Sequence, residues 1–228
     1  MTYTETVWDL EQLAQAERLA DWIFEQFRPY VRGRVAEVGA GIGTYSARIR
    51  DAGVEDLLLV EPDPGCAARL RSAFPNVAEE TLPDAPSLRH GDRDFVVALN
   101  AIEHIADDHA AVAAMGAALR PGGVLTLLVP AHPRLYGRLD AQYGHERRYT
   151  PARLRDVVER AGLHTLDLYR FNALGILGWV AKNRARAPSL DPRSLRAYER
   201  ILPAYRAVTE DRFRPPVGLS LVVHARRP

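Results

Sequence analysis

The stretch that decides the fold lies at residues 34–44 and reads RVAEVGAGIGT. Residues 34–38 form a short apolar run that is typical of a buried strand. Glycines at positions 39, 41 and 43 let the backbone turn tightly and approach a ligand without a Cβ in the way. Residues 44–51 then have the character of a helix that is closed by Gly53. A strand, a glycine loop and a helix N-terminus in this order predict a site for an anionic or polar ligand.

Apolar segments and helical segments alternate after this loop. We expect strands at residues 57–60, near Val77, at 95–99 and at 124–129. Pro64 suits the first turn of one intervening helix, and Asp107 or Asp108 can cap another that ends before the turn at 119–123. The alternation over residues 34–129 predicts a parallel sheet with helices on both faces.

The flanking segments extend this architecture. A helix is expected from about residue 10 to residue 30, another at 151–161, strands at 163–169 and 219–223, and a helical, irregular stretch at 171–215. The expected fold class is α/β: a doubly wound, mostly parallel, seven-stranded Rossmann-like sheet with an antiparallel last strand and a helical insertion before it. We expect a single domain over residues 1–228, with an N-terminal helical cap at 1–33, a cofactor-binding core at 34–129, and the acceptor-side loop, helical insertion and edge strands at 130–228.

The composition excludes several classes of protein. Of the 228 residues, 47% are hydrophobic and 26% are charged, which is ordinary for a globular domain and argues against disorder. A formal net charge of +1 gives no reason to expect a nucleic acid as partner. Cys66 is the one cysteine, so an intramolecular disulfide is excluded. We find no signal peptide and no apolar run of membrane-spanning length, and we expect a cytoplasmic protein.

The order of residues within the glycine loop separates two classes of nucleotide. A dinucleotide-binding loop has the spacing G-x-G-x-x-G, whereas here the third glycine comes one residue early. Glu37, two residues before Gly39, would repel a pyrophosphate and attract an ammonium or sulfonium group. Glu61 follows the second strand, where a carboxylate can accept hydrogen bonds from the ribose hydroxyls of an adenosine. The loop therefore favours a positively charged ligand over a dinucleotide.

Over residues 35–129 the chain resembles the class I S-adenosylmethionine (SAM) methyltransferases. Their first motif, E/D-x-G-x-G-x-G, is matched at residues 37–43, and the segments DFVVALNAIEHI at 94–105 and LRPGGV at 119–124 resemble later motifs. The resemblance implies SAM as the cofactor and S-adenosylhomocysteine as the product. It also implies a cofactor site that is formed by Glu37, Gly39, Ala40, Gly41, Gly43, Glu61, Pro62, Thr81, Leu82, Asn100, Ala101 and His104.

The segment at 130–150, PAHPRLYGRLDAQYGHERRYT, should lie at the mouth of the site because ligands bind beyond the carboxyl ends of parallel strands. His132 and His145 are the candidate catalytic bases, since imidazole titrates near neutral pH. The candidate acceptor-binding residues are Tyr136, Arg147, Arg148 and Tyr149, with the arginines holding a carboxylate or phosphate. In the alternative interpretation, the arginines pair with Asp140 and Glu146 and only order the loop. Residues 171–179 are apolar and suit either a pocket wall or ordinary core packing.

A metal site deserves a separate test. Glu103, His104, His132 and His145 together offer nitrogen and oxygen ligands. However, Glu103 and His104 are adjacent in sequence, and His104 suits a satisfied histidine beneath the loop. We expect no metal.

These observations predict a SAM-dependent methyltransferase. We expect it to act on a small-molecule acceptor, such as a hydrophobic or acidic intermediate of secondary metabolism, as a monomer or homodimer and without nucleic-acid or membrane partners. One alternative is an NAD(P)-dependent oxidoreductase, whose glycine loop would have to hold a pyrophosphate despite Glu37. Another is a SAM-binding protein without methyl-transfer activity, which an intact glycine loop does not exclude.

Overall fold

The computed structural model describes residues 10–185 and 192–228. Within them, seven strands form one sheet in the order β3-β2-β1-β4-β5-β7-β6. β7 lies between β5 and β6 and is antiparallel to both, whereas the pairs from β3 to β5 are parallel. The predicted doubly wound sheet with an antiparallel last strand is confirmed. The strands are β1 (Arg34–Val38), β2 (Asp56–Val60), β3 (Val77–Ala78), β4 (Arg93–Leu99), β5 (Leu119–Pro130), β6 (His164–Phe171) and β7 (Ser220–Arg226).

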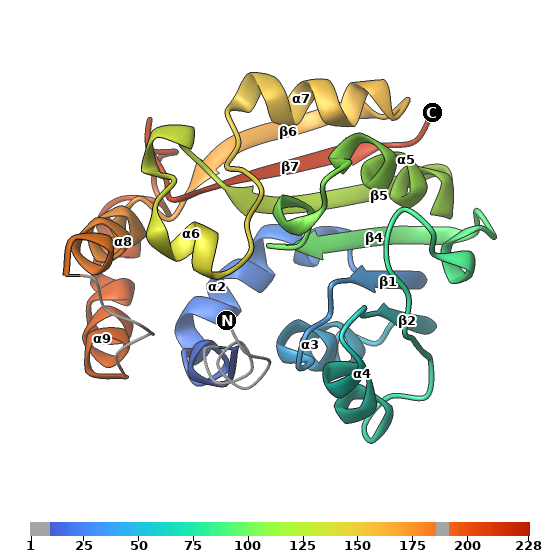
Figure 1. Ribbon diagram of the computed structural model, residues 1–228, viewed down its shortest axis with the longest axis horizontal. Helices are drawn as coiled ribbons and strands as arrows, with labels where there is room; N and C mark the ends of the chain where they lie inside the picture. Colours follow the sequence, from blue (N-terminus) through green and yellow to red (C-terminus); the bar gives the residue numbers. More distant parts are fainter. Residues whose placement is uncertain (1–9, 186–191) are drawn as a thin grey trace.

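Helices cover both faces of the sheet (Figure 1). One face packs against α5 (Asp108–Ala118) and α7 (Pro151–Arg160), and the other against α2 (Glu17–Phe27), α3 (Thr44–Asp51) and α9 (Pro192–Val208). Further helices are α4 (Pro64–Arg71), α6 (Arg138–Gln142) and α8 (Leu174–Ala185), with short 3-10 turns η1 (Arg28–Tyr30), η2 (Pro86–Leu88), η3 (Ile102–His104) and η4 (Pro133–Leu135).

The N-terminal helical region differs from its prediction. Residues 10–14 are helical, the helix is interrupted, and α2 starts at Glu17. The part of the predicted cap at residues 1–9 lies outside the described residues, as do residues 186–191 of the predicted helical stretch at 171–215. Asp107 and Asp108 were the two predicted caps of the helix that precedes residues 119–123. Asp107 is the cap of this helix, α5, because it accepts a hydrogen bond from the amide of Ala110 at 2.9 Å.

The alternation of side chains along each strand explains why the strands are apolar throughout. Val96 and Ala98 of β4 face the α5 side, and Phe95 and Val97 face the α2 side. Both faces are buried, so neither set of positions tolerates solvated side chains. In β1 the same alternation places Val35 on the α2 side of the sheet. Glu37 lies on that side as well, where Ser46 of α3 donates a hydrogen bond to it.

The glycine loop is pressed against the turn that follows β4. Gly39 has a φ of +72°, and a Cβ added to it would lie 2.7 Å from the Cβ of Ala101. Real Cβ atoms do not approach this closely, so the absence of a side chain at residue 39 sets the distance between the ends of β1 and β4.

We therefore expect Gly39→Ala to destabilise the protein by more than backbone strain alone. A positive φ costs an alanine about 1–2 kcal/mol, and the contact with Ala101 adds about 1–3 kcal/mol of overpacking. Gly53→Ala is the matched control, because Gly53 has a φ of +82° and an added Cβ would meet nothing within 4 Å. The measurement is the free energy of unfolding in urea.

The second half of this test is the double variant Gly39→Ala/Ala101→Gly, compared with Ala101→Gly alone. Removing the methyl group of residue 101 should recover the overpacking cost and leave the strain. Equal destabilisation by Gly39→Ala and Gly53→Ala would show that the contact with Ala101 has no energetic weight.

Candidate functional site

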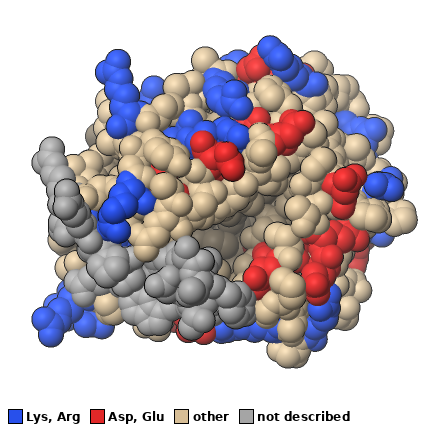
Figure 2. Space-filling view, in the orientation of Figure 1, with Lys and Arg blue, Asp and Glu red and all other residues tan. Residues whose placement is uncertain are grey.

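The cofactor half of the site lies where β1, β2 and β4 end. The glycine loop follows β1, Glu61 follows β2, and Asn100 follows β4. Because parallel strands end at the same edge of a sheet, these three segments meet there. Figure 2 shows that this face of the molecule is hollowed near its centre.

Glu61 joins the second strand to the glycine loop. Its side chain is buried, and its two carboxylate oxygens accept hydrogen bonds from the amides of Gly41 (2.7 Å) and Asp63 (2.9 Å). Burial raises the pKa of Glu61, although these hydrogen bonds oppose the shift. Asp63 itself caps α4 by accepting from the amide of Cys66. Glu61 is therefore the acid that faces the glycine loop.

Glu37 lies buried beneath the same loop. Ser46, in the first turn of α3, donates a hydrogen bond to its carboxylate at 2.5 Å. Burial raises the pKa of Glu37 to about 8, with the Ser46 hydrogen bond lowering it and the charge of Glu61 raising it. Ser46 is a site residue that the sequence pattern did not indicate. A hydroxyl in the first turn of the helix that follows a glycine loop is a signal by which it could have been identified.

The other predicted cofactor residues take several positions. Ala40 packs in a small apolar cluster with Leu59, Leu70 and Phe74, so it supports the loop from behind. Leu82 is buried in the core on the α5 side, whereas Pro62 and Thr81 are exposed. Asn100 is exposed with a φ of +50°, and its amide donates to the carbonyl of Leu128 at 2.8 Å. This hydrogen bond fixes the backbone after β4 to β5.

Asp140 organises the segment after β5. Its fully buried carboxylate accepts hydrogen bonds from Nε of Arg148 (2.7 Å) and the amide of Gly137 (2.9 Å), and it lies 2.9 Å from Nδ1 of His145. Burial alone would raise the pKa of Asp140, but the His145 hydrogen bond and the Arg148 charge lower it. Arg148 also donates to the carbonyl of Ala131. The pairing of Arg148 with Asp140 confirms that part of the alternative interpretation of the loop.

Arg147 and Tyr149 are held by other partners. Arg147 donates to the carbonyls of Ile105 (2.5 Å) and Ala106 (2.8 Å), and it lies 3.6 Å from the carboxylate of Asp108. It therefore pairs with Asp108 and not with Glu146, which corrects the expected partner. The fully buried Tyr149 donates to Asp108 at 2.9 Å. These contacts attach the loop to the turn after β4.

Tyr136 remains open to solvent. Its side chain is 42% exposed, and its hydroxyl donates to the carbonyl of His145 at 2.7 Å. Further along, the predicted apolar wall at 171–179 is divided. Phe171 is buried in the core, Trp179 lies against the guanidinium of Arg148 at 4.3 Å, and Leu177 is 71% exposed.

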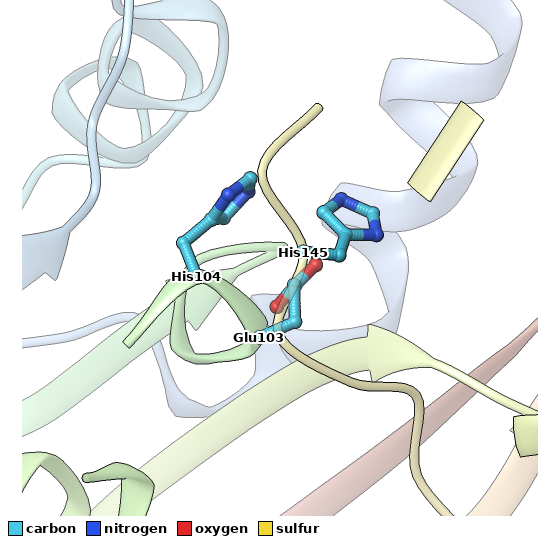
Figure 3. A group of neighbouring side chains, drawn as sticks. All are labelled: Glu103, His104 and His145. Carbon is cyan, nitrogen blue, oxygen red and sulfur yellow. The ribbon is translucent and has the colours of Figure 1, made fainter. Parts of the chain in front are cut away.

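Three side chains come together between the turn after β4 and the loop (Figure 3). In the described part of the chain, Glu103, His104 and His145 form a group whose potential ligand atoms all lie within 4.8 Å of one another. The rings of His104 and His145 are 4.8 Å apart between centroids and nearly perpendicular. Burial raises the pKa of Glu103 to about 8. His132 lies outside this group, has a φ of +60°, and carries a buried Nε2 without a hydrogen-bond partner.

Comparisons with known proteins place this geometry in a family. The model of a family described as methyltransferase domain matches residues 11–168. The chain solved with the Haloferax volcanii Trm112 methyltransferase activator has a TM-score of 0.65 at 17% identity, over 94% of each chain. A SAM-dependent methyltransferase from Archaeoglobus fulgidus has a TM-score of 0.63 at 13% identity, over 93% of this chain and 94% of that one. The [4+2]-cyclase SpnF has a TM-score of 0.59 at 17% identity, over 92% of this chain and 81% of that one.

Two further findings concern curated relatives and membrane-spanning helices. A search of curated proteins finds no match to the sequence. Among the helices in the described residues, none is both long and apolar enough to cross a membrane.

Glu37 makes the stability of the cofactor-free protein depend on pH. Its carboxyl group keeps its proton to about pH 8 in the folded state, whereas it ionises near 4.5 in the unfolded chain. Between these values the unfolded chain binds fewer protons, so the free energy of unfolding falls as the pH rises. Because glutamine does not titrate, we expect Glu37→Gln to gain stability relative to the wild type from pH 5 to pH 8.

Urea unfolding of both proteins at pH 5, 6, 7 and 8, without cofactor, measures this difference. Glu55→Gln, in the turn before β2, serves as the control for removing one carboxylate. A stability difference between Glu37→Gln and the wild type that stays constant over this range would contradict the assignment.

Proposed function

This chain belongs to the methyltransferase domain family, and we propose that it transfers the methyl group of SAM to a small-molecule acceptor. SAM is the cofactor. The observation that carries the proposal is the meeting of Glu61 with the glycine loop, where the carboxylate lies 2.7 Å from the amide nitrogen of Gly41. A carboxylate beside a side-chain-free loop at the ends of parallel strands suits the ribose of an adenosine.

In this proposal each segment of the cofactor half contacts a different part of SAM. Glu61 accepts from the ribose hydroxyls. Glu37 loses its proton when the positively charged sulfonium or amino group binds, and its carboxylate then balances that charge. Gly41 leaves room for the ligand, since among residues 10–185 and 192–228 an added Cβ would meet only Leu10, at 3.7 Å. The residues that border the rest of the cofactor are Gly39, Ala40, Gly43, Pro62, Thr81, Leu82, Asn100, Ala101 and His104.

The reaction is one in-line displacement. The acceptor atom bonds to the methyl carbon while the carbon–sulfur bond breaks, and S-adenosylhomocysteine leaves with the electron pair. The protein aligns the two reactants, which is worth several kcal/mol of barrier. A hydroxyl acceptor must also lose a proton, and His132 or His145 takes it. His132 is suited to this role because its Nε2 has no hydrogen-bond partner in the part of the chain that the structure describes.

The acceptor-side contacts favour a hydrophobic molecule over an acidic one. Both Arg147 and Arg148 are satisfied by carbonyl and carboxylate oxygens of the protein itself. An acidic acceptor would have to compete with these partners, whereas an apolar one would not. Among the predicted acceptor residues, Tyr136 is the exposed one and is the contact that we propose.

A SAM-binding protein without methyl transfer is the second candidate. One specific observation favours it: a chain of the same fold bears the name of a cyclase. Formation of S-adenosylhomocysteine in the presence of an acceptor separates the two functions.

Calorimetric titration with SAM, S-adenosylhomocysteine, NAD and NADP tests the cofactor class. We expect saturable binding of the first two and none of the last two, because the glycine loop lacks the G-x-G-x-x-G spacing that holds a pyrophosphate. Binding of NAD or NADP instead would overturn the proposed reaction.

Glu61→Ala tests the ribose contact. We expect SAM affinity to fall about 10- to 100-fold, which corresponds to the loss of hydrogen bonds to a charged group. Asp63→Ala is the matched control, because Asp63 lies two residues away and loses only the cap of α4. Titration of both variants with SAM is the measurement, and an unchanged affinity in Glu61→Ala would assign the ribose to another residue.

A further inference from the structure

The short turn η3 brings two consecutive side chains to one place. Glu103 and His104 both belong to η3, and His145 approaches them from the loop between α6 and α7 (Figure 3). The adjacency of Glu103 and His104 in sequence had argued against a shared site. In the structure their ligand atoms and that of His145 nevertheless lie within 4.8 Å of one another.

Glu103 is the most unusual member of this group. Its side chain is 0% exposed, and among the described residues neither carboxylate oxygen has a hydrogen-bond partner. Arg148, the cation that comes near, is already engaged by Asp140 and the carbonyl of Ala131. Because buried polar groups in proteins almost always have partners, two orphaned oxygens beside two imidazoles indicate a missing cation.

The surrounding contacts orient His145 and fix the spacing of the two segments. The Nδ1 atom of His145 lies 2.9 Å from the buried carboxylate of Asp140, so its Nε2 atom is left as the electron-pair donor. A carboxylate behind a histidine in this way is the usual support of a metal ligand. The amide of Glu146 also donates to the carbonyl of Glu103 at 2.8 Å, which ties the loop to η3.

We propose that Glu103, His104 and His145 bind one divalent transition-metal ion, with Zn²⁺ as the reference ion, and that Asp140 is the positioning residue for His145. Two imidazoles and one carboxylate suit Zn²⁺ and not Mg²⁺, which prefers oxygen ligands and water. Three protein ligands leave one position open in a tetrahedral site. His104 is exposed and His145 is partly buried, so the ion can reach the group from the side of His104.

A metal ion at this site changes the roles of the two candidate catalytic histidines, His132 and His145. A nitrogen that binds a metal cannot accept a proton, so His145 becomes a ligand and His132 is the base. The open position would take an oxygen atom of the acceptor, a statement that rests on the proposed function. Metal binding itself does not, because it requires neither SAM nor acceptor.

The test is the binding of Zn²⁺ to the chelator-treated, full-length protein, followed by competition with a chromophoric chelator in the absence of SAM. We expect one Zn²⁺ per chain. Glu103→Gln and His145→Ala should each weaken binding more than 100-fold, and Asp140→Asn by 10- to 100-fold. His164→Ala, which removes an exposed histidine of β6, should bind as the wild type does.

Folding of each variant is checked by its circular dichroism and thermal transition. Glu103→Gln is the decisive variant, because it keeps the shape of the side chain and removes a buried acid, so the fold should persist. Replacing Zn²⁺ with Co²⁺ adds a second measurement, since visible absorption of tetrahedral intensity requires ligands from the protein. Binding that is equal in the wild type and Glu103→Gln would show adventitious zinc at surface histidines and would overturn the proposal. Loss of zinc binding without loss of SAM binding leaves the proposed methyl transfer standing.

Discussion

The structure depends on the close approach of two backbone segments at the ends of β1 and β4. A side chain at residue 39 would collide with Ala101, so the loop passes over the strand end only as glycine. This contact brings the loop within reach of Glu61 and sets the direction of the chain that enters η3. The cofactor half and the group around Glu103 are therefore positioned by the same contact. Ala101, which Gly39 approaches, directly precedes η3, and η3 carries Glu103.

The acceptor side is held together in a different way. The buried carboxylate of Asp140 orders it. This carboxylate contacts the side chains of Arg148 and His145 and the backbone amide of Gly137. Such a network is stabilising only when all members are present, because each one left alone would be a buried, unpaired polar group. The loop is consequently rigid at its base, while Tyr136 near its start remains exposed. A fixed base beneath an exposed aromatic ring is suited to positioning a ligand that arrives from solvent.

The sequence pattern was sufficient for the sheet and the glycine loop, because both depend on local rules. Apolar runs, helix caps and the position of Glu61 after a buried strand are visible in the chain itself. The sequence suggested Asp140 as a partner for Arg148, but it did not indicate Asp108 as the partner of Arg147 and Tyr149, because that contact is fixed only by the packed fold. Glu103 shows the limit most clearly. Its neighbours in sequence do not reveal that its carboxylate is buried without a partner.

The placement of β7 between β5 and β6 has a consequence for how the protein forms during synthesis. Residues 34–130 contain every strand of the parallel half, so this half can pair as soon as it leaves the ribosome. The hydrogen-bonding edge of β5 then waits until residues 220–226 arrive, and β6 has no partner strand before that moment. Residues 220–226 thus close the sheet, and the acceptor side is completed after the cofactor side.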